Sequence, residues 1–250
     1  DGMTLTSAGN VAFGNDATND AVTVSTDAVT IDTSGAGTNV EFTADVDGAQ
    51  DLTVTAGAGD ITFSAGADMG GTTAVGDGAG SAVTLSGDTV TVRGVGADGD
   101  ISLTGTTSVA LGGDLSTINA GAIQVTGDTS LIASANTVAT AGGAADSVTV
   151  DGTLDGASDL LIDVGAGGVS FNDVIGGSTP LTSLTVEDQP QGSGNAGAAS
   201  VTFDGSVATT AAQTIRAGAI STNASGAGTA TYQTTDSTVT WDGAVTLDGD

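Results

Sequence analysis

Aspartates that alternate with small residues are the side chains in this sequence whose type and spacing most directly suggest a chemical site. Asp45, Asp47 and Asp51 lie in the segment DVDGAQD, and Asp155 and Asp159 lie in the related segment LDGASD. Calcium prefers several hard oxygen ligands, and carboxylates that alternate along a turn supply them. These five residues are therefore candidate calcium ligands. The alternative interpretation is that they form and solvate turns, which is a common role of aspartate.

The sequence lacks the residues that most enzymes use for acid–base or nucleophilic catalysis. It contains no histidine and no cysteine, and its two basic residues are Arg93 and Arg216. A Ser-His-Asp triad and the lysine of a phosphate-binding loop are both absent. Polysaccharide cleavage would need a basic residue near the developing negative charge or a close pair of carboxylates. No such pair stands out, so we predict a protein that is not an enzyme and that binds no cofactor other than the candidate calcium.

The charge of the chain limits its partners. Its formal net charge is −28, and such a surface attracts cations and repels its own copies at low ionic strength. A nucleic-acid-binding protein needs a basic patch, and anionic membrane surfaces also attract basic segments. No apolar run approaches the ~20 residues of a membrane-spanning helix. We therefore expect no nucleic-acid partner and no membrane insertion, and non-specific binding of divalent cations.

Short strands are predicted along the whole chain by a recurring triplet of an aliphatic residue, a small polar residue, and an aliphatic or aromatic residue. Examples are Leu52–Val54, Ile101–Leu103 and Val148–Val150. This alternation of β-branched residues is typical of a strand with one buried face. A polar residue and a glycine often follow, as at Thr104-Gly105, and glycine permits a sharp corner. The chain is therefore predicted to be all-β.

A long internal copy indicates a repeat architecture. The segment from Asn39 to Phe63 aligns without a gap to the segment from Ser147 to Phe171. In repeat proteins each unit buries its apolar edge against a neighbour. The offset between the two copies divides into about five or six coils of roughly 18 to 22 residues, a usual solenoid repeat length. At ~20 residues per coil the chain would contain about twelve coils.

The aromatic residues favour a solenoid over an antiparallel sandwich. Each phenylalanine and the single tryptophan takes the third position of a triplet, so stacked coils would align them inside one corner as a core stack. These residues are Phe13, Phe42, Phe63, Phe171, Phe203 and Trp241. A sandwich has no reason for this repetition. We predict a single-stranded parallel β-helix, or β-solenoid, that runs as one continuous domain over residues 1–250 and is a segment of a longer chain or polymer.

Two further features suggest surface roles. Residues 187–199, EDQPQGSGNAGAA, contain no triplet and are predicted to leave the solenoid as a loop. Thr-x-Thr pairs occur at residues 4–6, 53–55, 89–91 and 238–240. A flat ice-binding array would need such a pair once per coil on one face, whereas along this chain the pairs are sporadic. We therefore interpret these threonines as outward-facing strand residues.

Several segments resemble the repeats of very large secreted bacterial surface proteins of the filamentous-haemagglutinin and autotransporter-like class. They are DLTVTAGAGDITF at 51–63, GVSFNDVIGG at 168–177, PLTSLTV at 180–186 and VTFDGSVATTAAQTI at 201–215. The resemblance implies a right-handed parallel β-helix at the cell surface that serves as an adhesin or as a matrix or filament component. Its motifs are compositional, so it transfers no functional residue.

Together these features predict a secreted bacterial structural protein that is not catalytic. We expect a stiff acidic rod, filament or surface coat that forms by end-to-end continuation of the solenoid, since no polar cap is evident at either terminus. Exposed strand edges at solenoid ends favour such addition. The alternative is an adhesin or binding module that presents residues 187–199 to a glycan or to a receptor on a host or neighbouring cell.

Overall fold

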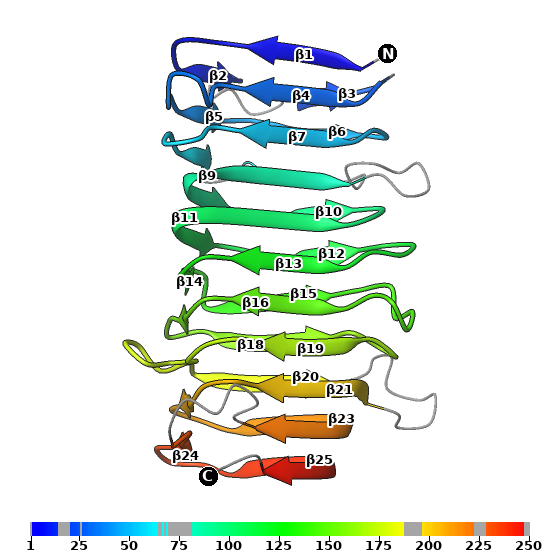
Figure 1. Cartoon of the computed structure of the whole chain (residues 1–250), viewed down its shortest axis with the longest axis vertical. Helices are drawn as coiled ribbons and strands as arrows, with labels where there is room; N and C mark the ends of the chain where they lie inside the picture. The colour runs from blue at the N-terminus through cyan, green and yellow to red at the C-terminus, as the bar shows by residue number, and fades with distance from the viewer. Residues whose placement is uncertain are drawn as a thin grey trace.

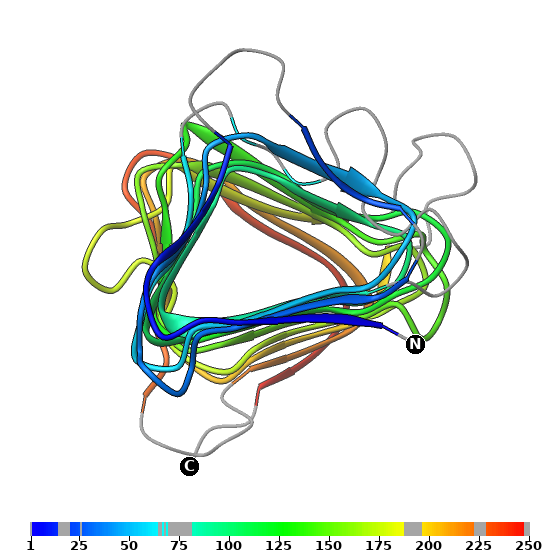
Figure 2. The same cartoon turned by 90° about the horizontal axis from the view of Figure 1, so that it is seen from above.

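The chain folds as a parallel β-solenoid with a triangular cross-section (Figures 1 and 2). The computed structural model describes residues 2–14, 21–25, 27–64, 67, 69, 82–187, 197–222 and 229–247. These residues contain 25 strands and no helix. All of the strand pairings among them are parallel, including the first at β1–β4 and the last at β23–β25. The predicted all-β parallel solenoid is confirmed.

Each coil crosses three flat faces, and the strands of one face form a continuous ladder. The first face contains β1 (Met3–Thr6), β4 (Val29–Asp32), β7 (Leu52–Thr55), the first part of β9 (Val83–Val92), the first part of β11 (Ile101–Leu111), β13 (Ile123–Thr126), β16 (Val148–Asp151), β19 (Gly168–Phe171), β21 (Ala198–Phe203), and the last parts of β23 (Gln213–Thr222) and β25 (Val239–Leu247). Figure 1 shows these strands stacked along the long axis of the molecule.

The other two faces follow the same plan. The second face contains β2 (Val11–Phe13), β5 (Val40–Phe42), β8 (Ile61–Phe63), the last parts of β9 and β11, β14 (Thr129–Leu131), β17 (Leu154–Asp155), the bridging residue Ile175, β22 (Val207–Thr209) and β24 (Tyr232–Thr234). The third face contains β3 (Ala21–Val24), β6 (Asp45–Gly48), the bridging residue Met69, β10 (Val95–Ala97), β12 (Leu115–Thr117), β15 (Ala135–Ala139), β18 (Asp159–Asp163), β20 (Ser183–Glu187), and the first parts of β23 and β25.

The coils differ in length more than the sequence suggests. Residues in register on the first face are as close in sequence as Val83 and Ile101, and as distant as Val169 and Val201. The second separation exceeds the expected coil length of roughly 18 to 22 residues, because corners accept extra residues while the strands stay in register. The described strands of the first face make 11 rungs and ten full turns, fewer than the twelve coils expected. At ~4.8 Å per coil, ten turns form a rod of about 48 Å.

The predicted phenylalanine stack consists of two stacks on different faces. On the second face the rings of Phe13 and Phe42 lie 5.0 Å apart, and those of Phe42 and Phe63 lie 4.5 Å apart. On the first face Phe171 stacks on Phe203 with 5.3 Å between ring centroids. Trp241 belongs to the third face, since it pairs with Ile215, and its ring lies 6.3 Å from Phe203. The expectation of one common corner is therefore corrected.

The reason is that the internal copy is out of phase with the coils. Val40 begins β5 on the second face, whereas its counterpart Val148 begins β16 on the first face. The two copies are thus offset by four and two-thirds turns, and every strand of the copy is rotated by one face. The same segment pattern fits on different faces, which shows that the three faces obey one local rule.

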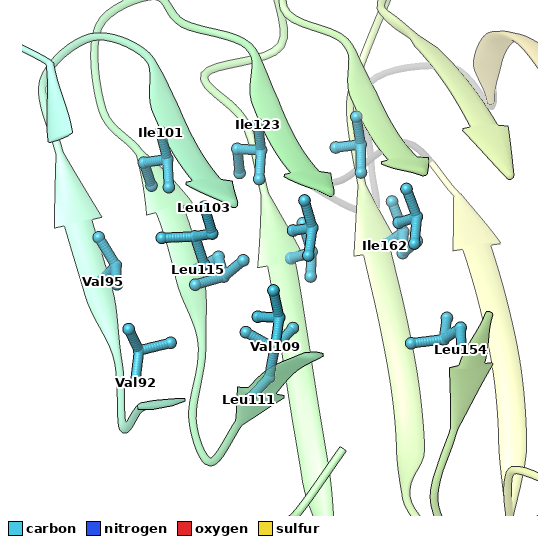
Figure 3. Close-up of a cluster of buried hydrophobic side chains, with 14 of the residues drawn as sticks. Val92, Val95, Ile101, Leu103, Val109, Leu111, Leu115, Ile123, Leu154 and Ile162 are labelled. Carbon is cyan, nitrogen blue, oxygen red and sulfur yellow. The ribbon is translucent and has the colours of Figure 1, made fainter. Parts of the chain in front are cut away.

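That rule is an inward column of aliphatic side chains on each face. Figure 3 shows side chains of neighbouring coils, among them Ile101, Leu115 and Ile123, pointing into the shared interior. All three are at most 1 % exposed. A buried side chain of this size contributes ~1.5–3 kcal/mol, whereas ordering one backbone residue costs ~1–2 kcal/mol. A coil therefore needs the coils above and below it to be stable.

Glycine is required where the chain turns from the first face to the second. Gly105, Gly127 and Gly152 follow one another in successive coils at this corner. Gly127 has φ +113°, and a Cβ atom there would lie 2.1 Å from the carbonyl oxygen of Gly105. Gly152 has φ +122°, and its Cβ would lie 2.7 Å from the carbonyl group of Gly127. A side chain at this corner would push adjacent coils apart.

We predict that Gly127→Ala lowers the free energy of unfolding, because alanine at positive φ costs about 1–3 kcal/mol and its Cβ collides with the preceding coil. Gly35→Ala is the matched control, since nothing lies within 4 Å of a Cβ at Gly35. The measurement is the midpoint of denaturant unfolding by circular dichroism. Equal midpoints for the two variants would contradict the role of this corner.

Candidate functional site

The five candidate calcium ligands are distributed over two faces and the corner that precedes the first face. Asp45 and Asp47 lie on β6 of the third face, and Asp51 lies immediately before β7. Asp155 ends β17 on the second face, and Asp159 begins β18 on the third. In the part of the chain that the structure describes, no group of three or more acidic side chains is arranged to hold a metal ion.

Three of these carboxylates link one coil to the next. Asp51 Oδ1 accepts a hydrogen bond from the backbone N–H of Ala82 at 2.8 Å. Asp155 Oδ1 accepts from the backbone N–H groups of Ser178 and Thr179 at 2.8 and 2.9 Å. Asp159 Oδ1 accepts from the Ser183 hydroxyl at 2.5 Å. These bonds favour the turn-forming interpretation, while calcium binding stays a prediction.

The same use of polar side chains extends along the corner that precedes the second face. The backbone N–H of Asn39 donates to Asn10 Oδ1 at 3.1 Å, and that of Asp60 donates to Asn39 Oδ1 at 3.0 Å. In the next coil the N–H of Thr89 donates to Asp60 Oδ1 at 3.2 Å. Each of these side chains thus closes the corner of the coil that follows it.

Other corners repeat this bond. Asp100 Oδ1 accepts from the N–H of Ala122 at 2.8 Å, and Asp114 Oδ1 accepts from the N–H of Thr137 at 2.7 Å. Sequence reasoning missed this role because the two partners lie 21 to 31 residues apart, and the separation changes with coil length. The only local signal is the Asp or Asn placed immediately before a triplet.

Among the described residues, Asp32 and Tyr232 have shifted pKa values with clear causes. The Ser34 hydroxyl and backbone N–H both donate to Asp32 Oδ1, at 2.6 and 2.9 Å. These bonds lower the pKa of Asp32. Burial raises the pKa of Tyr232, whose ring packs edge-on against Phe203 and Trp241 in the interior near the last coil. Both shifts follow from folding contacts rather than from a reactive centre.

The two arginines lie in shallow grooves lined mainly by glycine and alanine. Arg216 Nη1 lies 3.7 Å from Glu187 Oε2, and its groove also contains Asp242. Arg93 lines a second groove with Asp114 and Ser116. Arg216 thus has two carboxylates near it, Glu187 through the ion pair and Asp242 as its register partner on β25. Among the described residues that line the Arg93 groove, Asp114 is the one carboxylate.

The first and last described coils expose apolar side chains at positions that are buried or partly buried in the coils between them. On the first face, Met3 and Leu5 of β1 are 59 % and 37 % exposed, and Leu247 of β25 is 73 % exposed. The equivalent Leu85 in the middle of the column is fully buried. Within the described residues, β1 pairs only with β4, and the first-face part of β25 pairs only with β23. Among the described residues, the first and last coils each present a strand edge beside an exposed apolar column, and we call these two places the end surfaces.

The loop expected at 187–199 lies mostly outside the described residues. Glu187 ends β20 and Ala198 begins β21, while 188–196 are not described. The adhesin alternative depends on that segment, so it stays a prediction. Among the residues that the structure describes, no helix is long and apolar enough to cross a lipid bilayer.

Comparisons with known proteins give no relative for this chain. No family model, no curated protein and no solved structure matches it.

We predict that Asp100→Ala destabilises the fold by about 0.5–1.5 kcal/mol, the usual net contribution of one hydrogen bond. Asp100→Asn is the matched control, because its side-chain oxygen still accepts from the N–H of Ala122. Both variants remove the same negative charge, so a difference between them reports the bond. Equal melting temperatures would show that the bond contributes nothing.

A second prediction concerns calcium. If the aspartates mainly close corners, Ca²⁺ and Mg²⁺ at equal concentration will raise the melting temperature equally, by screening the net charge of −28. A specific calcium site would give a larger rise with Ca²⁺, since Mg²⁺ demands a smaller octahedral site. That larger rise, lost in Asp155→Asn or Asp159→Asn, would restore the calcium interpretation.

Proposed function

We propose that this protein is a non-catalytic structural component of the bacterial cell exterior. It acts as a segment of a stiff acidic rod, filament or surface coat. The observation that carries the proposal is the pair of end surfaces, where free strand edges lie beside exposed Met3, Leu5, Val245 and Leu247. Their occupant is another coil of the same solenoid pattern.

The chemistry of the end surfaces fits such a coil. A free parallel strand edge offers unpaired backbone N–H and C=O groups to a further strand. The exposed apolar column beside it continues the column that holds Leu85 and Leu103 in the interior. The internal copy shows that one segment pattern fits on different faces of the solenoid. A further coil with this pattern therefore fits onto the end of the rod in more than one rotational position about the axis. Addition of coils therefore lengthens the rod without a new kind of contact.

The charge of the chain suits a hydrated rod. With 30 acidic and two basic residues, the sides of neighbouring rods repel one another at low ionic strength, within a screening length of ~8 Å at physiological salt. Addition of coils along the axis of the rod is then favoured over lateral association between rods. The resemblance to filamentous-haemagglutinin and autotransporter-like repeats supports an extracellular location.

We predict that the chain self-associates end to end and that Val245→Lys with Leu247→Lys abolishes the association. Lysine at these inward positions places charge in the column that a further coil must cover. Thr246→Lys is the matched control, because Thr246 lies on the same rung and points outward. Sedimentation and electron microscopy at physiological ionic strength measure the assembly. Dispersed monomers of the unmodified chain at all concentrations, or loss of assembly in the control, would contradict the proposal.

A further inference from the structure

One outward column of the first face carries a hydroxyl group in almost every coil. The pairings place these residues in a single line along the rod. The line is Thr4, Thr30, Thr53, Thr84, Ser102, Gln124, Thr149, Ser170, Thr202, Ser221 and Thr246. Gln124 is the one member of this line without a hydroxyl group.

A second outward column runs beside it, two residues further along each strand. It contains Thr6, Asp32, Thr55, Ser86, Thr104, Thr126 and Asp151. From Thr53 to Thr126 neither column contains a charged residue. We call these two columns together the hydroxyl face.

The positions of these hydroxyl groups are set by the fold. Neighbouring coils are ~4.8 Å apart, and two residues along a strand span ~6.6 Å. Behind the columns, Val54, Leu85 and Leu103 are fully buried, so the strands have a packed support. Seen along the axis, the sides of the triangle are flat rather than curved (Figure 2). The result is a flat, regular two-dimensional array.

Among the described residues, the other two faces carry shorter hydroxyl columns, such as Thr62 and Thr91 on the second face and Thr185, Thr214 and Thr240 on the third. Outward positions of the second face include Ala12, Glu41, Thr62 and Ala110. A matching outward column on the third face contains Asp163, Glu187, Arg216 and Asp242. Within the described residues, the long hydroxyl column is therefore a property of the first face.

We propose that the hydroxyl face binds ice. In tetrahedrally bonded water with O···O distances of about 2.75 Å, two molecules that share a neighbour lie about 4.5 Å apart. The coil spacing of ~4.8 Å is close to this repeat, so hydroxyl groups in successive coils take the place of successive lattice waters. The threonine methyl groups restrict the waters between the columns, and a rigid sheet adds no ordering cost at binding.

The array cannot be recognised in the sequence, because the spacing between its members follows the lengths of the coils. Of the Thr-x-Thr pairs, 89–91 lies at the second face and 238–240 at the third, while 4–6 and 53–55 lie on the first. The remaining members alternate threonine with serine at separations that follow coil length. The sporadic spacing in the sequence is therefore compatible with one regular column in space.

The test uses the whole chain in thermal-hysteresis and ice-recrystallisation assays. The unmodified chain is expected to inhibit recrystallisation, and Thr53→Lys with Thr84→Lys to require a several-fold higher concentration. Thr91→Lys is the matched control, because Thr91 lies on the same strand as Thr84 but on the second face. Circular dichroism and melting curves verify that all the variants fold.

Two outcomes would overturn the proposal. One is an unmodified chain that is no more active than an unrelated acidic protein at equal concentration. The other is equal loss of activity in the double variant Thr53→Lys with Thr84→Lys and in the control Thr91→Lys, which would make the effect one of charge rather than of face. The readout is independent of end-to-end assembly, which the Val245 and Leu247 variants test separately.

Discussion

The parallel hydrogen-bonded ladder between coils is the interaction on which the rest of the structure depends. A single coil cannot offset the entropy of ordering its backbone with the few side chains that it buries. Stability therefore arises between coils, and every other feature serves their close approach. Position 127 is a glycine because a Cβ atom there would collide with the carbonyl oxygen of Gly105 in the preceding coil. Asp100 accepts a hydrogen bond from the backbone N–H of Ala122 in the coil that follows.

This dependence explains which parts of the fold the sequence predicts. A triplet such as Val83-Thr84-Leu85 specifies inward and outward side chains, and its glycine corner specifies where a strand ends. These local rules suffice for an all-β chain, and the internal copy adds the repeat architecture of a solenoid. They do not specify a face, because the face depends on the number of residues in all the preceding corners. Phe63 and Phe171 hold equivalent places in the copied segments and yet lie on different faces.

The same limit applies to the candidate sites. In the sequence, Asp45 and Asp47 form a spacing typical of metal ligands, whereas the bonds made by Asp51 and Asp155 depend on backbone groups in the next coil. A carboxylate that caps a corner and one that binds calcium look alike until the partner strand is placed. The hydroxyl face is a second case, since Ser102 and Thr84 become neighbours only through the register of β9 and β11.

The ends and the faces of the rod thus carry separate properties, and the ladder couples them. A further coil that pairs in parallel with β25 must continue the column of Thr246 as well as the apolar column of Leu247. The proposed growth at this end surface would therefore extend the first column of the hydroxyl face, provided that the added coil also places a hydroxyl residue outward. A surface that binds a lattice gains contacts in proportion to its length, so the proposed elongation would strengthen the proposed binding of each rod to ice. Repulsion between carboxylates at the corners would keep such rods apart, so that the hydroxyl face would stay accessible along the added length.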